Sequence, residues 1–389
     1  MAFSRTQSSD SSVSIDEVNA ALATVNDPEI HRPITEIGMV KGVDIRKGGV
    51  VEVGVFLTVS GCPMKTTIID RVTDAVMKVA GVTKVSVELD VMNDEQRANM
   101  KQILRGGRPD KENPFTKPGS LTKIYAIASG KGGVGKSSIT ANLAVSLAQR
   151  GYSVGLLDAD VYGHSIPRML NAMAPPTMVE GLIMPPQGYG VRVISMLPFK
   201  PGGIEQPVAF RGPMLHRALE QFLSDVWWGD LDYLLLDLPP GTGDIAMSTA
   251  QLLPHAEIVV VTTPQRGAAD VAIRAGTLAT QTHQKVLGVI ENMSAFPCPH
   301  CGEPLDLFGA GGGQLVADGL SKAFGSEIPL LGQIPFDVRL REGGDNGEPL
   351  VIAFPESPAG AEIISIAGAL ATTPRGLAGM SLNISPAGR

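Results

Sequence analysis

The chain has 389 residues, which is more than one ordinary domain and predicts two. Its 39 acidic residues outnumber 32 basic ones, and the formal net charge of −7 comes without a long basic run, which disfavours a nucleic-acid-binding surface. Three cysteines make no disulfide framework, the first ten residues lack the apolar segment of a secretory signal, and no apolar stretch approaches the ~20 residues of a membrane span. We therefore expect a cytoplasmic protein that binds neither nucleic acid nor membrane.

The N-terminal part predicts a small α+β domain over residues 12–95. Apolar positions that recur at three and four indicate helices, and runs of β-branched residues indicate strands. The expected order is helix, strand, strand, helix, strand, at residues 14–25, 39–45, 50–59, 64–79 and 82–91. Residues 96–120, rich in glycine, proline and basic side chains, predict a linker that is partly helical at its start.

Cys62 is a chemical candidate in this first domain. Pro63 follows it, and proline is favoured in the first turn of a helix. Cys62 is therefore expected near a helix N-terminus, where the helix dipole favours the thiolate. The alternative is a buried cysteine that packs behind a tight turn.

Residues 121–372 predict an α/β domain with a doubly wound, mostly parallel sheet, because strand-like runs alternate with helical ones. An apolar run at residues 123–128 suits a buried strand, and residues 138–149 have the apolar spacing of a helix. Between them a G-x-x-x-x-G-K-[ST] loop can bind nucleotide phosphates through its backbone N–H groups and Lys136. A plain glycine-rich turn is the alternative. The expected nucleotide-binding residues are Gly130, Lys131, Gly132, Gly133, Val134, Gly135, Lys136, Ser137 and Ser138.

Two further apolar runs end in carboxylates. Residues 152–157 lead into Asp158, and residues 233–236 lead into Asp237. Parallel strands place their carboxyl ends at the edge of the sheet where ligands bind. A carboxylate that only caps a helix is the alternative for each.

A magnesium site is expected beside the phosphate-binding loop. Asp237 is suited to hold Mg²⁺ directly or through water, and Ser137 offers a hydroxyl to the same ion. Residues 238–244, rich in proline and glycine, are expected to form a switch loop that senses the γ-phosphate.

Cys298 and Cys301 form a C-x-x-C pair, which supplies half the ligands of a tetrahedral metal site or a four-iron cluster. The only other cysteine is Cys62, so a four-cysteine site cannot close within one chain, whereas a two-fold dimer would bring four thiolates together. Iron-sulfur and zinc both fit such a site. Redox-active or inert thiols are a third possibility, although the glycine and proline that follow favour a loop over the helix of thiol oxidants.

These motifs resemble the deviant-Walker P-loop ATPases, and in particular the Mrp/ApbC branch. Their signature is an additional lysine near the start of the loop, which is Lys131 in this chain. The resemblance extends over roughly residues 123–353. It also rests on DAD-V-YG at residues 158–163, LLLDLPPGTGD at 234–244, VTTPQ at 261–265 and IENMS at 290–294.

The resemblance implies roles for individual residues. Lys131 would contact nucleotide bound by the partner subunit, Asp158 would orient the attacking water, and Asn292 would recognise adenine. With Lys136, Lys131 and Asp158 form the implied catalytic set. A cation supplied across a closed interface would neutralise charge on the transferred phosphoryl group.

For the whole chain, the resemblance implies a homodimeric Mg²⁺-dependent ATPase that holds a [4Fe-4S] cluster between paired Cys298 and Cys301. It would receive the cluster from an assembly scaffold and transfer it to apo iron-sulfur proteins. The N-terminal domain resembles the PaaD/SufT-like domain of iron-sulfur assembly proteins. This resemblance rests on two motifs, Asn26-Asp27-Pro28-Glu29 and Thr58-x-x-Gly61-Cys62-Pro63.

The alternative function is a positional ATPase like MinD or ParA, with zinc or redox-active thiols at the C-x-x-C pair. Residues 373–389 are expected to form a flexible tail and are a poor candidate for the amphipathic helix that a membrane-cycling ATPase would need.

Overall fold

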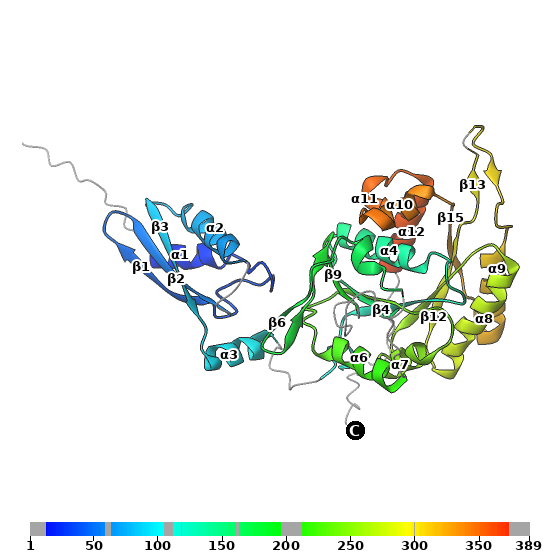
Figure 1. Ribbon diagram of the computed structural model, residues 1–389, viewed down its shortest axis with the longest axis horizontal. Coiled ribbons are helices and arrows are strands. Elements are labelled where there is room, and N and C mark those ends of the chain that lie inside the picture. Colours follow the sequence, from blue (N-terminus) through cyan, green and yellow to red (C-terminus); the bar gives the residue numbers. More distant parts are fainter. Residues whose placement is uncertain are drawn as a thin grey trace, which may run out of the picture. The chain divides into compact units, whose positions relative to one another are not determined.

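The computed structural model forms two compact units (Figure 1). One consists of Met1–Pro109 with Thr177–Met184, and the other of Asp110–Pro176 with Pro185–Arg389. Cys62 and the tail from residue 373 lie outside the described residues. The structure describes residues 13–58, 64–104, 112–117, 119–160, 163–195, 212–298 and 300–372.

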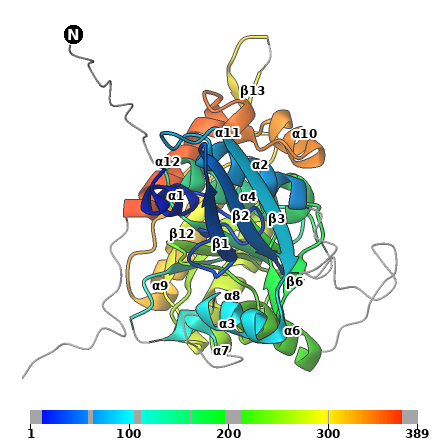
Figure 2. The same cartoon turned by 90° about the vertical axis from the view of Figure 1, so that its left-hand side faces the viewer.

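The first unit is the expected α+β arrangement. Its sheet has the order β1-β2-β3, and the three strands lie side by side in Figure 2. Strand β2 runs antiparallel to β1 and parallel to β3. The elements are α1 (Ile15–Leu22), β1 (Val40–Arg46), β2 (Val50–Leu57), α2 (Lys65–Val76), β3 (Lys84–Val91) and α3 (Asp94–Leu104).

Alternate residues of β2 are buried, so one face of this sheet is apolar. Helix α2 buries Ile68, Val72 and Val76, which recur every fourth residue and so share one side of the helix. The hairpin β6 (Thr177–Val179) and β7 (Leu182–Met184) groups with this unit. Its Glu180 forms an ion pair of 2.9 Å with Arg97 of α3.

The second unit is built on an eight-stranded sheet of order β15-β12-β11-β4-β10-β5-β9-β8. Among the described strands of this sheet, only β8 is antiparallel to its neighbour, which confirms the predicted mostly parallel sheet. The strands are β4 (Lys123–Ser129), β5 (Val154–Asp158), β8 (Gln187–Gly188), β9 (Val191–Ser195), β10 (Tyr233–Asp237), β11 (Glu257–Thr262), β12 (Val286–Asn292) and β15 (Leu330–Ile334).

Helices cover both faces of this sheet, and for this reason β5 and β10 are buried along their whole length. Figure 1 shows α4, α11 and α12 on one side of the sheet and α6 and α7 on the other. None of the helices within the described residues is both long and apolar enough to cross a membrane. The helices are η1 (Pro114–Thr116), α4 (Lys136–Gln149), α5 (Ile166–Met169), α6 (Gly212–Ser224), α7 (Asp244–Leu252), α8 (Arg266–Gln281), α9 (Gly312–Phe324), α10 (Val338–Asn346), α11 (Leu350–Ala353) and α12 (Pro358–Thr372).

Candidate functional site

The phosphate-binding loop lies between β4 and α4, as the sequence predicts. Residues 130–135 connect the two elements, and Lys136, Ser137 and Ser138 begin the helix. The loop packs tightly on α8, because a Cβ added at Gly130 would lie 2.4 Å from the backbone N of Ala272. A side chain at this position would push the loop away from its support.

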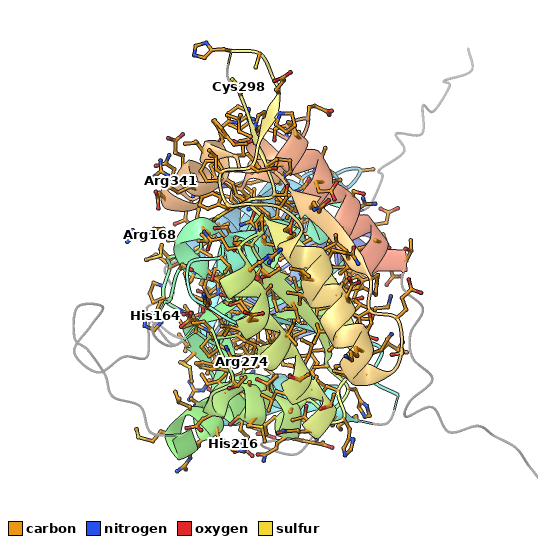
Figure 3. All side chains as sticks on the ribbon, turned by 90° about the vertical axis from the view of Figure 1, so that its right-hand side faces the viewer. His164, Arg168, His216, Arg274, Cys298 and Arg341 are labelled. Carbon is orange, nitrogen blue, oxygen red and sulfur yellow. The ribbon has the colours of Figure 1, made fainter. Side chains whose placement is uncertain are left out.

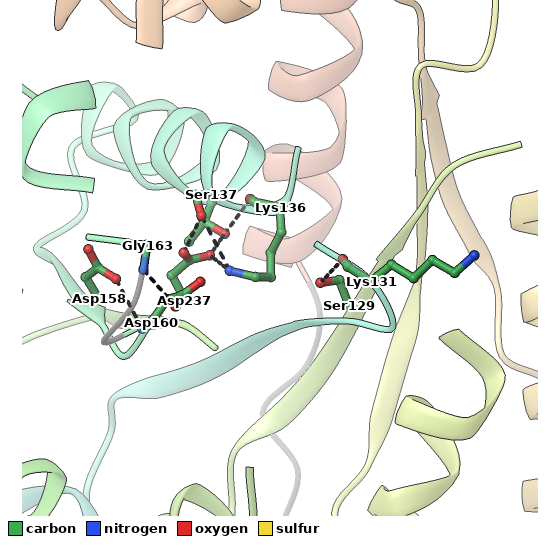
Figure 4. A network of polar contacts seen from close by, with 9 residues as sticks. Ser129, Lys131, Lys136, Ser137, Asp158, Asp160, Gly163 and Asp237 are labelled. Atoms are coloured by element: carbon green, nitrogen blue, oxygen red, sulfur yellow. Dashed lines mark hydrogen bonds and ion pairs between the residues drawn. The ribbon is translucent and has the colours of Figure 1, made fainter. Parts of the chain in front are cut away.

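Lys136, Ser137 and Asp237 meet in one buried polar network (Figure 4). Lys136 Nζ lies 2.7 Å from Asp237 Oδ1, and Ser137 Oγ donates to Asp237 Oδ2 at 2.6 Å. The Lys136 side chain is 6% exposed and that of Asp237 is 0% exposed. The hydroxyl and carboxylate oxygens are hard ligands of the kind that Mg²⁺ prefers, so this pair fits a magnesium site.

Thr140 belongs to the same network, and the sequence reasoning missed it. Its Oγ1 lies 2.9 Å from Asp237 Oδ1 and 2.8 Å from the carbonyl oxygen of Lys136, so the hydroxyl can donate to either. The only signal in the sequence was a hydroxyl one helical turn after Lys136. Thr140 therefore helps to fix the orientation of the Asp237 carboxylate.

Asp158 lies beside Asp237, because β5 and β10 pair in parallel with these two residues in register. Asp158 Oδ1 accepts a hydrogen bond from the backbone N of Asp160 at 3.2 Å, whereas Oδ2 is buried with no hydrogen-bond partner among the described residues. Burial, and then the charge of Asp237, raise the pKa of Asp158 well above its usual value. A carboxyl group in this position can hold or accept a proton near the loop.

Lys131 takes no part in the buried network. Its side chain is exposed and extends away from Lys136 and Asp237 (Figure 4). Ser129 Oγ donates to the Lys131 carbonyl oxygen at 3.1 Å. The Lys131 Nζ atom lies 3.3 Å from the position that a Cβ on Gly267 would occupy, at the start of α8. The two lysines of the loop are thus directed to different places.

The Asn292 side chain is placed against the phosphate-binding loop. It ends β12, is 2% exposed, and donates from Nδ2 to the carbonyl oxygen of Val134 at 2.9 Å.

The neighbouring Glu291 is a buried carboxylate that the sequence analysis did not single out. It accepts from the backbone N of Gly313 at 2.5 Å and from Gln333 Nε2 at 2.7 Å.

The switch segment, residues 238–244, is irregular over residues 238–243, as its proline and glycine content predicts, and its last residue, Asp244, begins α7. The backbone N of Leu238 donates to the carbonyl oxygen of Ile127 at 3.1 Å, and that of Gly241 donates to Ser129 at 2.8 Å. These bonds hold the segment beside the end of β4, where the phosphate-binding loop begins.

Cys298 and Cys301 lie on a short hairpin made of β13 (Phe296–Pro297) and β14 (Pro304–Leu305). The hairpin projects from the second unit, and Figure 3 labels Cys298 on it. The backbone N of Cys298 donates to Glu303 O at 2.9 Å, and that of Gly302 donates to Cys298 O at 2.8 Å. The pair therefore sits in a tight turn, as expected, and not at the start of a helix.

The turn also favours a thiolate. Backbone N–H groups of Cys301 and His300, and then the Cys301 thiol, lower the pKa of Cys298. Cys298 is half-buried, Cys301 is exposed, and neither forms a disulfide. Within the described part of the chain, no group of three or more His, Cys, Asp or Glu side chains is arranged to hold a metal ion. The pair thus has two thiol ligands to offer and needs others from elsewhere.

Three aromatic rings fasten the base of this hairpin. Phe296 and Phe308 pack on Phe336, with ring centroids 5.7 Å and 6.0 Å away. The backbone N of Phe336 donates to Ala295 O at 2.7 Å. The hairpin base is therefore attached to the segment that follows β15, the strand that pairs with β12, while the cysteines remain outside the nucleotide network.

Comparisons with known proteins agree with this geometry. Residues 120–371 match the family model of the NUBPL iron-transfer P-loop NTPases, and residues 15–88 match that of the iron-sulfur cluster assembly proteins. The iron-sulfur cluster carrier protein of Mycobacterium tuberculosis (strain ATCC 25618 / H37Rv) is 56% identical over 372 residues, which are 96% of this chain and 97% of the relative. That of Bacillus subtilis (strain 168) is 38% identical over 325 residues, 82% of this chain and 87% of the relative.

A solved structure supports the same assignment. A nucleotide-binding protein from Archaeoglobus fulgidus, in complex with ADP, is 37% identical and has a TM-score of 0.51. The similarity covers 62% of this chain and 92% of that protein. The resemblance stated from the motifs is thereby confirmed, and the chain belongs to the family of NUBPL iron-transfer P-loop NTPases, with an N-terminal domain of the iron-sulfur cluster assembly family.

Proposed function

We propose that this protein is an ATP-hydrolysing iron-sulfur cluster carrier that works as a homodimer. One observation carries the proposal: the same chain has a buried phosphate-loop network and a projecting hairpin with two thiols. The relatives named iron-sulfur cluster carrier proteins support it. In this proposal residues 121–372 are the ATPase domain, residues 12–95 a separate assembly domain, residues 96–120 the linker, and residues 373–389 a tail.

The nucleotide site would be used as follows. Lys136 leaves Asp237 and binds the β and γ phosphates, which frees the Asp237 carboxylate and the Ser137 hydroxyl to hold Mg²⁺. When bound, Mg²⁺ supplies positive charge that stabilises the phosphate oxygens. Asp158 orients the attacking water with its buried carboxyl group. Lys131 of one subunit reaches the nucleotide of the other and neutralises charge on the transferred group.

The hairpins of two subunits would hold the cluster. Cys298 and Cys301 from each chain supply four thiolates, which match the ligand set of a [4Fe-4S] cluster. The N–H groups that lower the pKa of Cys298 favour the ligating form of its sulfur. The cluster is the cargo, received from an assembly scaffold and passed to apo iron-sulfur proteins. Cys62 would serve delivery or partner engagement, not cluster binding.

Nucleotide and cluster would be coupled through the loop of residues 239–244 and the segment from Asn292 to Cys301. Asn292 touches the phosphate-binding loop, and the hairpin begins only a few residues later. A shift at Asn292 would therefore be transmitted to the base of the hairpin. Such coupling is reciprocal, so ATP must change cluster affinity by the same factor by which the cluster changes ATP affinity.

Anaerobic reconstitution with iron and sulfide tests the carrier function. We expect one four-iron cluster per two chains in the wild-type protein. Cys298→Ser and Cys301→Ser should abolish stable cluster binding and leave the fold intact, because each removes two of four ligands from the dimer. Cys62→Ser is the matched control and should keep the cluster. Absorbance, iron and sulfide content and zinc analysis provide the measurement.

Three results would contradict this proposal. If the wild-type protein binds zinc and takes up no iron and sulfide, the cysteines hold a structural metal and not a cluster cargo. Loss of the cluster in Cys62→Ser alone would show that the ligands are assigned wrongly. A cluster bound by monomers would exclude the shared site.

A further inference from the structure

Asn292 joins the phosphate-binding loop to the central sheet. Its Nδ2 donates to the Val134 carbonyl oxygen at 2.9 Å, and the residue is only 2% exposed. Val134 lies between two glycines with left-handed backbone, Gly133 at φ 80° and Gly135 at φ 84°. A Cβ added at Gly135 would lie 2.2 Å from Asn292 Nδ2. The amide therefore lies directly against the backbone of the loop.

The strand beneath holds this amide in place. Asn292 pairs with Ile334 of β15, on one side of β12, and β11 pairs with β12 on the other. The adjacent Glu291 carboxylate, buried in the same strand, accepts from the backbone N of Gly313 and from Gln333 Nε2. Backbone pairing and these side-chain bonds thus fix the end of β12. A donor fixed in this way can orient a loop that consists mostly of glycine.

The bond determines where one backbone N–H group of the loop points. The Val134 carbonyl and the Gly135 N–H belong to the same peptide unit, and the described chain contains no cis peptide bond. In a trans peptide unit the C=O and the N–H point in opposite directions. Holding the Val134 carbonyl oxygen against Asn292 therefore turns the Gly135 N–H away from Asn292. Backbone N–H groups of this kind of loop are the ligands of nucleotide phosphate.

We propose that Asn292 is a positioning residue for phosphate binding: it fixes the Val134–Gly135 peptide so that the Gly135 N–H faces the phosphates. This inference rests on the proposed nucleotide-binding function and gives Asn292 a role that does not require a base. A residue that only recognises adenine would affect ATP and leave a base-free polyphosphate unaffected. A residue that positions the loop affects both ligands by the same factor.

The test is titration calorimetry of the full-length nucleotide-free protein with inorganic triphosphate and, separately, with ATP, both with Mg²⁺. Asn292→Ala should bind inorganic triphosphate about tenfold more weakly, which corresponds to about 1.4 kcal/mol and is the scale of one buried hydrogen bond. The ratio of ATP affinity to triphosphate affinity should stay unchanged. Asn292→Asp keeps the shape without the donor and serves as the second variant if Asn292→Ala does not fold.

Gln284→Ala is the matched control. Gln284 Nε2 is also a buried amide that bonds backbone carbonyls, those of Leu253 and Ala256, each at 3.4 Å. It lies just before β12, far along the strand from Asn292, and should leave triphosphate binding unchanged while costing similar thermal stability.

Wild-type affinity for inorganic triphosphate in the Asn292 variants would overturn the inference, whether or not ATP binding falls. A wild-type protein that binds ATP but not inorganic triphosphate would count against it equally. Cluster content and ATP turnover do not enter this measurement. A failure of the carrier function is therefore distinguishable from a failure of the positioning role.

Discussion

Replacing Asp237 by asparagine should strengthen nucleotide binding without Mg²⁺ and weaken it with Mg²⁺, relative to the wild-type protein. Without nucleotide, Asp237 is the buried counter-charge of Lys136, with 2.7 Å between Oδ1 and Nζ. Asparagine keeps the size of the side chain and an oxygen for Lys136, and it removes the negative charge. Lys136 is then a nearly buried cation that lacks the ionic partner it has in the wild-type protein.

The magnitude follows from the burial of both groups. Removing one partner of a buried ion pair costs about 3–5 kcal/mol, and here the side chains are 6% and 0% exposed. Nucleotide phosphates supply the missing negative charge, so binding recovers part of this cost. If one third is recovered, about 1.0–1.7 kcal/mol, Mg²⁺-free ADP or ATP binds about 5- to 17-fold more tightly to Asp237→Asn than to the wild-type protein. With Mg²⁺ the order reverses, because asparagine is a weaker ligand for the ion.

The assay is titration calorimetry with ATP, in EDTA and in excess Mg²⁺, together with thermal unfolding of the nucleotide-free protein. Ser137→Ala is the matched control, because it removes the hydroxyl that we propose as a ligand of Mg²⁺ and leaves the Lys136–Asp237 ion pair intact. It should lose the Mg²⁺-dependent gain in affinity, and its Mg²⁺-free affinity should match that of the wild-type protein.

Two results would refute this reasoning. If Asp237→Asn binds Mg²⁺-free ATP no more tightly than the wild-type protein does, the ion pair does not compete with phosphate. If Mg²⁺ strengthens ATP binding equally in both proteins, Asp237 does not hold the ion.

Two further outcomes are expected. Lys131→Ala should keep most nucleotide binding and lose ATP hydrolysis, because Lys131 is exposed and outside the Lys136–Asp237 network; unchanged turnover in a phosphate-release assay would contradict its role across the dimer interface. Asp158→Asn should stabilise the nucleotide-free protein at neutral pH, since burial and Asp237 raise the pKa of Asp158 and make its ionised form costly. The gain in unfolding free energy should be absent below about pH 4, the range of an unperturbed aspartate, and should grow as the pH rises. Urea denaturation at several pH values measures this gain. A gain that does not depend on pH would exclude the raised pKa as its cause.

Local patterns in the amino-acid sequence determined much of this protein. The phosphate-binding loop is a continuous strand, loop and helix, so its glycines, Lys136 and Ser137 could be assigned from their order alone. Alternating strand and helix patterns determined the parallel sheet, and parallel strands place Asp158 and Asp237 at the same edge. The cysteine count likewise determined that four cysteine ligands cannot come from one chain around the Cys298 pair.

The tertiary structure alone decided which groups touch. Strand order places β10 between β4 and β5, and only this order brings Asp158 into register with Asp237. The hydrogen bond from Asn292 to Val134 joins segments far apart in sequence. The Glu291 carboxylate can accept hydrogen bonds from Gly313 and Gln333 only when β12 and β15 are paired. Periodicity reports which face of an element is buried, whereas a hydrogen bond depends on atoms from separate elements at a distance of about 3 Å. That distance is set by packing of the whole sheet and its helices, and no local pattern of residues encodes it.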